Sequence, residues 1–201
     1  MEATSQSAGP ADPDRTAPGE LELVRQFINT ADIAPGEDEL GDLEALRRWL
    51  RERQLIGPRE RLAPGDLERA LTVREALRNL LESRSHGAVD DDALRSLNLV
   101  PEGALLRIAF DRDGTPRLEP VASGLDRAFA ELYAIIRCAA LEGTWERLKV
   151  CADHGCLWAF YDHSKNRSRS WCNMAVCGNR AKARHYRERK RPVAEQEGAT
   201  A

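Results

Sequence analysis

Four of the five cysteines in this chain of 201 residues fall into two pairs of equal spacing. Cys151 and Cys156 form one C-x4-C pair, and Cys172 and Cys177 form another, with fifteen residues between the pairs. Thiolates on two short loops can converge on a tetrahedral metal ion, and four of them are typical of structural zinc. Because four protein ligands leave no position open for water, the pattern predicts a structural Zn²⁺ site and not a catalytic one.

A basic segment follows the fourth cysteine directly. Residues 145–191 contain twelve Lys and Arg against four Asp and Glu, although the whole chain has a net charge of −3. A basic module on an acidic body indicates that this module alone faces a polyanion, although a run of charge can also be a solvated surface. The candidate DNA contacts are Asn179, Arg180, Lys182, Arg184 and Arg187. In an alternative role, Arg180 braces the metal loop by hydrogen bonds to its carbonyls while Asn179 caps the helix.

The elements around the cysteines must bring the two pairs together. Apolar residues at 157–161, followed by a polar stretch at 162–166, predict two short strands around a turn. The second pair is expected to open the last helix, which gives a small, treble-clef-like zinc finger with four cysteine ligands, whose helix start can face phosphates. Trp158 and Trp171 are expected in the core of the finger, although such rings can also stack on unpaired bases.

The residues before the finger predict a mainly α-helical domain with one β-hairpin, an α+β fold. Apolar residues recur with helical period near 21–31, 43–50, 66–81, 90–99 and 125–138. Alternating apolar residues at 106–110, the turn at Asp113-Gly114 and the return through Leu118 predict the hairpin. Cys138, the fifth cysteine, is expected to be a buried thiol on the last of these helices.

Arg74 stands in the apolar face of the third helix, where an apolar residue is expected. Its stem can pack while the guanidinium reaches water, or the guanidinium can lie in a pocket and bind a carboxylate or phosphate. On the second interpretation, Arg74 and Asn29 are candidate contacts of a small-molecule effector.

The chain lacks the features of a membrane or secreted protein. No run reaches the roughly 18 apolar residues of a membrane span, and the start has no apolar signal core. We therefore expect a cytoplasmic protein with no membrane partner, which agrees with reduced thiolates for zinc. Composition divides the chain into a disordered tail at 1–19, a helical domain at 20–144, the finger at 145–191 and a disordered tail at 192–201.

The four cysteines, Trp171 and the run Cys177-Gly178-Asn179-Arg180 followed by Ala181-Lys182-Ala183-Arg184 resemble the CGNR zinc finger. Proteins of that family usually join the finger to an N-terminal stress-induced-regulator domain called ABATE. Phe27-Ile28-Asn29-Thr30, the helices with Trp49 and with Arg74, and Leu97-Asn98 are similar to that domain. The resemblance implies a bacterial transcription regulator of the stress response whose finger binds zinc and DNA and whose body senses an effector.

Two other classes of function stay open. The finger could dock on an acidic protein of the transcription machinery as a zinc-stabilised interaction module. An enzyme would hold a small anion at Arg74, but the sequence shows no paired nucleophile and base and no catalytic metal motif. A homodimer would add affinity to a small finger.

Overall fold

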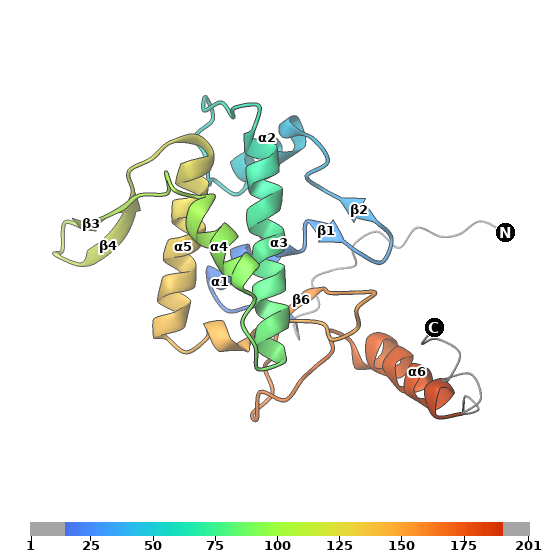
Figure 1. Cartoon of the computed structure of the whole chain (residues 1–201). Helices are drawn as coiled ribbons and strands as arrows, with labels where there is room; N and C mark the ends of the chain where they lie inside the picture. Colours follow the sequence, from blue (N-terminus) through green and yellow to red (C-terminus); the bar gives the residue numbers. More distant parts are fainter. Residues whose placement is uncertain (1–14, 191–201) are drawn as a thin grey trace.

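The computed structural model of the protein describes residues 15–190 (Figure 1). Most of the predicted tails, residues 1–14 and 192–201, lie outside the described residues, as does residue 191. The helices are α1 (Leu21–Ile28), α2 (Leu43–Glu52), α3 (Asp66–Ser85), α4 (Asp91–Leu99), α5 (Gly124–Leu141) and α6 (Asn179–Lys190). No helix in the described range is long and apolar enough to cross a membrane.

Within residues 15–190 the strands form three small antiparallel pairs. They are β1 (Ala31–Asp32) with β2 (Glu37–Asp38), β3 (Leu106–Phe110) with β4 (Pro116–Pro120), and β5 (Leu148–Val150) with β6 (Ala159–Tyr161). The predicted α+β fold with a hairpin is confirmed, and the β1–β2 pair is an addition that the sequence did not indicate.

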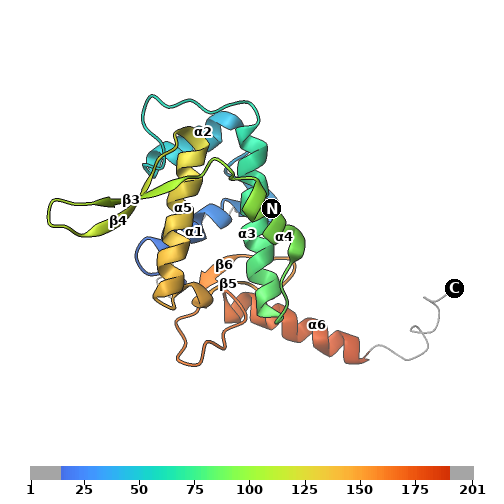
Figure 2. The ribbon, with the colours of Figure 1, turned by 60° about the vertical axis from the view of Figure 1, so that its left-hand side comes forward.

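The core contains the buried residues of α1, α3 and α5, with α1 packed against both of the longer helices (Figures 1 and 2). Helix α1 buries Leu21, Val24, Phe27 and Ile28, the face that helical periodicity predicts. Burial of one such side chain stabilises a fold by roughly 1.5–3 kcal/mol. Helix α1 can therefore hold its position although it has only eight residues.

The strands of the predicted finger belong to this same core. Leu148, Val150, Ala159 and Tyr161 pack in one cluster with the apolar residues of α1 and α3. The finger is therefore joined to the helical domain through side chains as well as through the chain.

Two expectations need correction. Residues 15–19, assigned to a disordered tail, lie against the body: Ala17 is buried, and the Arg15 carbonyl accepts a hydrogen bond of 3.0 Å from the Tyr161 amide. This contact is a hydrogen bond between backbone groups, which leaves no periodic pattern of apolar residues in the sequence. Cys138 is exposed and not buried, because α5 turns Ile135 and Ala139 to the core and Cys138 to the other side.

Candidate metal centre and nucleic-acid interface

The four paired cysteines converge on one point, and their sulfur atoms all lie within 4.8 Å of one another. The Sγ atoms of Cys156 and Cys172 are 3.6 Å apart, and those of Cys172 and Cys177 are 3.7 Å apart. A tetrahedral zinc ion with Zn–S bonds of about 2.3 Å has sulfur–sulfur edges of about 3.8 Å. A disulfide would need sulfur atoms about 2.05 Å apart. The donor set therefore fits a tetrahedral metal ion with thiolate ligands.

A small apolar cluster encloses the cysteines. Cys151, Cys172 and Cys177 are buried together with Phe160, and Trp158 and Trp171 pack against them. The prediction that the two tryptophans belong to the core of the finger is confirmed. This shielding covers three of the four ligands, and Cys156 is half-buried, which suits a structural metal site.

The thiols influence one another through hydrogen bonds. Those donated by Cys156 and Cys172 lower the pKa of Cys151, and the same hydrogen bonds raise the pKa of Cys156 and of Cys172. Four thiolates at this separation repel one another unless a cation lies between them. The cluster is thus chemically suited to a divalent metal and poorly suited to carry four negative charges alone.

Each cysteine loop is shaped by a polar residue close to a ligand. In the first loop, the Asp153 carbonyl accepts a hydrogen bond of 2.7 Å from the Cys156 amide. In the second, the Asn173 side chain accepts hydrogen bonds from the amides of Ala175 and Val176, at 2.8 and 3.2 Å. Asn173 therefore caps the π-helical turn Met174–Gly178 that leads into α6. The proposed cap, Asn179, instead donates to the Ala175 carbonyl at 2.9 Å.

Asp153 also fixes the basic helix to the first cysteine loop. Only 3% of this residue is exposed. Its carboxylate lies 2.9 Å from Nε of Arg180 and 3.5 Å from an Nη atom of Arg184. Arg180 also donates to Sγ of Cys177 at 3.2 Å, and this hydrogen bond raises the pKa of Arg180. The bracing role of Arg180 is present in the structure, with a cysteine sulfur and a carboxylate as partners and not the loop carbonyls.

Several other side chains of α6 are exposed. Lys182, Tyr186 and Arg189 are exposed, and their i, i+4, i+7 spacing places them on one face of the helix. Arg187 is exposed on the side of Arg180 and Arg184, one turn further from the metal site. Of the five predicted DNA contacts, Arg180 and Arg184 have a carboxylate partner within the chain, whereas Lys182 and Arg187 extend from the surface of α6.

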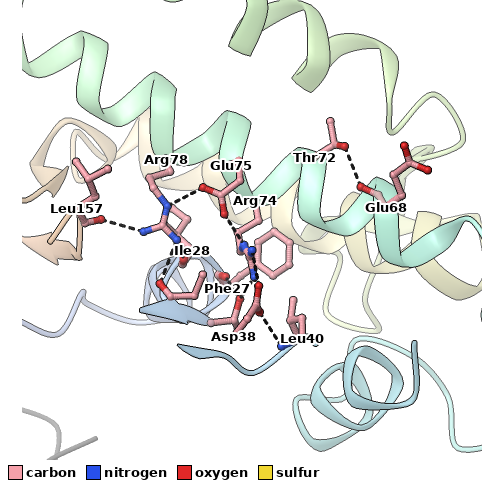
Figure 3. Close-up of polar contacts among 12 residues, drawn as sticks. Phe27, Ile28, Asp38, Leu40, Glu68, Thr72, Arg74, Glu75, Arg78 and Leu157 are labelled. Carbon is pink, nitrogen blue, oxygen red and sulfur yellow. Dashed lines mark hydrogen bonds and ion pairs between the residues drawn. The ribbon is translucent and has the colours of Figure 1, made fainter. Parts of the chain in front are cut away.

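A buried arginine that the sequence did not single out joins the finger to the body (Figure 3). Arg78 on α3 is 1% exposed. It donates to the Leu157 carbonyl of the finger at 3.0 Å and to the Ile28 carbonyl of α1 at 2.6 Å, and Glu75 holds its Nε at 3.0 Å. Leu157 directly follows the ligand Cys156, so α3 is hydrogen-bonded to the metal-binding loop itself.

Arg74 and Asn29, the predicted effector contacts, also have partners within the chain. The buried guanidinium of Arg74 binds both carboxylate oxygens of Asp38 at 2.7 and 2.8 Å, and its Nε binds Glu75 at 2.8 Å. The interpretation in which this guanidinium reaches water is therefore wrong (Figure 3). The Asn29 amide pairs with the backbone of Ala159 on β6, donating at 2.8 Å and accepting at 2.7 Å. An effector contact at either residue stays a prediction, while the structure shows a joining role for both.

A hollow of about 430 Å³ lies elsewhere on the body. Its lining is Arg51, Gln54, Ile56, Gly57, Pro58 and Arg127. Neither Arg51 nor Arg127 has a hydrogen-bond acceptor for its buried Nε within residues 15–190. The lining has cationic groups but no nucleophile and no general base.

Comparison with known protein families agrees with this architecture. Residues 147–190 match the CGNR zinc finger. Residues 21–142, more than half of the chain, match the ABATE family, described as "Putative stress-induced transcription regulator". No curated protein matches the chain. The chain therefore belongs to the ABATE family and carries a CGNR zinc finger C-terminal to the ABATE domain.

Proposed function

We propose that the protein is a cytoplasmic, zinc-dependent transcription regulator that binds DNA through α6. One observation carries the proposal: a helix with six Lys and Arg and one Glu begins two residues after the ligand Cys177 and exposes its basic side chains from Arg180 to Arg189. Zinc supplies no reaction here; it would hold the two cysteine loops together and so fix where α6 begins.

The contacts of α6 suggest that some of its basic residues position the helix and others bind phosphate. Arg180 and Arg184 are positioning residues, because Asp153 holds both against the cysteine loop. Lys182, Arg187 and Arg189 are the proposed phosphate contacts. An α-helix is about 10–12 Å across with its side chains and fits the major groove of DNA, which is about 12 Å wide.

The joint between finger and body supports a regulatory role for the ABATE domain. Arg78, Asn29 and the shared apolar core connect the metal loop to α1 and α3, so a change in the body can reach α6 through packed groups. We assign the effector to the hollow lined by Arg51 and Arg127. Two guanidinium groups suit a small carboxylate or phosphate.

Thermal unfolding in the presence of single anions tests the effector assignment. A ligand that binds only the folded state at 100 times its Kd stabilises it by about 2.7 kcal/mol. Acetate, citrate, inorganic phosphate and a nucleoside monophosphate would each be compared at equal ionic strength. We expect a stabilising shift with at least one of them and its loss in Arg127→Ala. Absence of any shift at millimolar concentration would contradict the assignment.

Selection from random duplex DNA tests the main proposal. The metal-loaded protein is expected to enrich a sequence motif, and removal of the metal by a chelator should abolish the enrichment. Lys182→Ala with Arg187→Ala should weaken binding, whereas Arg48→Ala with Arg112→Ala, which removes two exposed charges from the body, should not.

The result also separates the alternatives. Salt-sensitive binding without an enriched motif would indicate a nonspecific polyanion binder and contradict a regulator that selects its sites. Absence of binding at low salt would favour a finger that docks on an acidic protein. We infer a regulator and not an enzyme, and turnover of a small anion at the hollow would contradict that inference.

A further inference from the structure

The β3–β4 hairpin has one face made entirely of apolar residues. The register pairs Leu106 with Pro120, Ile108 with Leu118 and Phe110 with Pro116. The opposite face carries the ion pairs of Arg107 and Arg117 with Glu119. Ile108 and Phe110 remain 68% and 69% exposed, and the hairpin projects from the body in both views (Figures 1 and 2). A two-stranded hairpin is only marginally stable in water, and further strands paired to its edge would stabilise it.

Only one edge of the hairpin can accept another strand. The amides of Asp111 and Val121 donate to the carbonyls of Thr115 and Leu105, so hydrogen-bonded pairs occupy the odd-numbered positions of β3. In an antiparallel pair the intervening residues direct their N–H and C=O groups outward. On β4 two of these outward positions are Pro116 and Pro120, which have no N–H to donate.

The edge of β3 has no such block. The outward positions of β3 are Leu106, Ile108 and Phe110, which all retain an N–H group. No strand other than β4 pairs with β3 within the described part of the chain. Native proteins usually block or cover an edge of this kind. Here β4 is blocked by prolines while β3 is open and apolar.

We propose that the partner of this edge is a second copy of the chain, with β3 pairing antiparallel to β3 of the partner in a four-stranded sheet. A twofold axis at Ile108 sets Ile108 opposite the partner's Ile108 and Leu106 opposite the partner's Phe110. The outward N–H and C=O groups then match in position, as an isologous contact requires. The apolar faces of the two hairpins join into one surface.

The charges on the other face favour this register. Arg107 lies opposite the partner's Ala109, so the arginines of the two copies are not set against each other across the new pair. Each Arg107 keeps its Glu119 within its own hairpin, at 2.7 Å. The side chains of β3 are thus compatible with a second copy of the strand, because apolar residues oppose apolar residues on one face and arginine opposes alanine on the other.

The hairpin lies on the opposite side of the body from α6 in both views, so the dimer leaves both basic helices uncovered (Figures 1 and 2). The inference goes beyond the proposed function. Its test measures oligomeric state without nucleic acid, so the dimer and DNA binding succeed or fail separately.

Sedimentation of the full chain across a concentration series tests the dimer. The wild-type protein is expected to shift from monomer to dimer as its concentration rises. Ile108→Lys places two like charges at the twofold axis and should weaken the dimer by more than about tenfold. Leu141→Lys is the matched control, because Leu141 is 71% exposed at the far end of α5. A wild-type protein that stays monomeric, or a dimer that Ile108→Lys leaves intact, would overturn the proposal.

Cross-linking tests the register. Opposed residues of a hydrogen-bonded antiparallel pair have Cα atoms about 5.5 Å apart, within the range that a disulfide bridges. In a Cys138→Ser background, Ile108→Cys should form a covalent dimer under mild oxidation, whereas Leu141→Cys should not. Circular dichroism would confirm that each variant is folded. Loss of the dimer in Ile108→Lys without cross-linking of Ile108→Cys would reject the β3–β3 pairing.

Discussion

Replacement of Arg78 by Met tests how firmly α3 holds the finger. Arg78→Met keeps most of the aliphatic stem but removes the donors that satisfy the Leu157 and Ile28 carbonyls, at 3.0 and 2.6 Å. Arg78 is 1% exposed, so water cannot replace these donors without a rearrangement. A buried polar group left without a partner costs about 1–3 kcal/mol. Glu75 also loses one of its two arginine partners and keeps the other, Arg74.

The two unsatisfied carbonyls together cost about 2–6 kcal/mol, a large part of the roughly 5–15 kcal/mol that stabilises a typical domain. Denaturant unfolding measures this loss of stability directly, and the expected fall in Tm is about 4–24 °C for a chain of this size. Because Leu157 follows a metal ligand, transfer of zinc to a chelator should also become faster. Arg95→Met is the control: its ion pair with Asp92 is exposed, so the change should cost less than about 0.5 kcal/mol.

The cost of removing the Arg78 guanidinium from water argues against a large loss of stability in Arg78→Met. A buried charge can be replaced by an apolar residue without loss when its burial costs as much as its hydrogen bonds return. If Arg78→Met unfolds within about 0.5 kcal/mol of the wild type and keeps its zinc equally long, the joint does not depend on Arg78.

Three further changes test the metal site and the ion pairs. Cys172→Ser removes one of four ligands and should lose the metal, measured by elemental analysis, while helical circular dichroism persists; unchanged metal content would contradict the site. Asp153→Asn should release Arg180 and raise amide exchange in the first turns of α6, and protection equal to that of the wild type would show that Asp153 does not hold the helix. Asp38→Asn should cost about 1–2 kcal/mol at pH 7. Burial raises the pKa of Asp38, but hydrogen bonds from Arg74 outweigh it and hold the pKa below the usual value. The stability due to Asp38 is thus fully present above the unfolded pKa and lost as the pH falls through the lower folded pKa. The difference between wild type and variant should shrink below about pH 4, and a difference that grows there would contradict the sign.

Local patterns predicted much of this molecule. The apolar face of α1 follows from its i, i+3, i+7 spacing, and the hairpin follows from alternation around Asp113-Gly114. The metal cluster could be predicted equally well from the sequence. Each cysteine pair lies within a loop of six residues, and paired cysteines are by themselves a sign of metal binding. In each case the signal and the structure span the same short segment.

The joint between finger and body could not be predicted in this way. Arg78 and Leu157 are 79 residues apart in the sequence, and Asn29 and Ala159 are 130 apart. Neither residue type nor spacing identifies a partner at that separation. Asp153 is the exception, because a lone acid inside a cysteine loop of a basic module is a visible signal. It indicates an internal partner for some of the basic residues, as Arg180 and Arg184 show.

The salt dependence of DNA binding tests the central claim, that α6 is the DNA-binding element, most directly. Affinity of the metal-loaded protein for its selected duplex would be measured by fluorescence anisotropy from low to physiological salt. The slope of log K against log salt changes by roughly 0.9 for each phosphate contact. Lys182→Ala with Arg189→Ala should weaken binding and flatten the slope by nearly two such contacts, while Arg48→Ala with Arg112→Ala should leave it unchanged. Equal slopes for wild type and the α6 variant would show that DNA, if bound, is bound elsewhere.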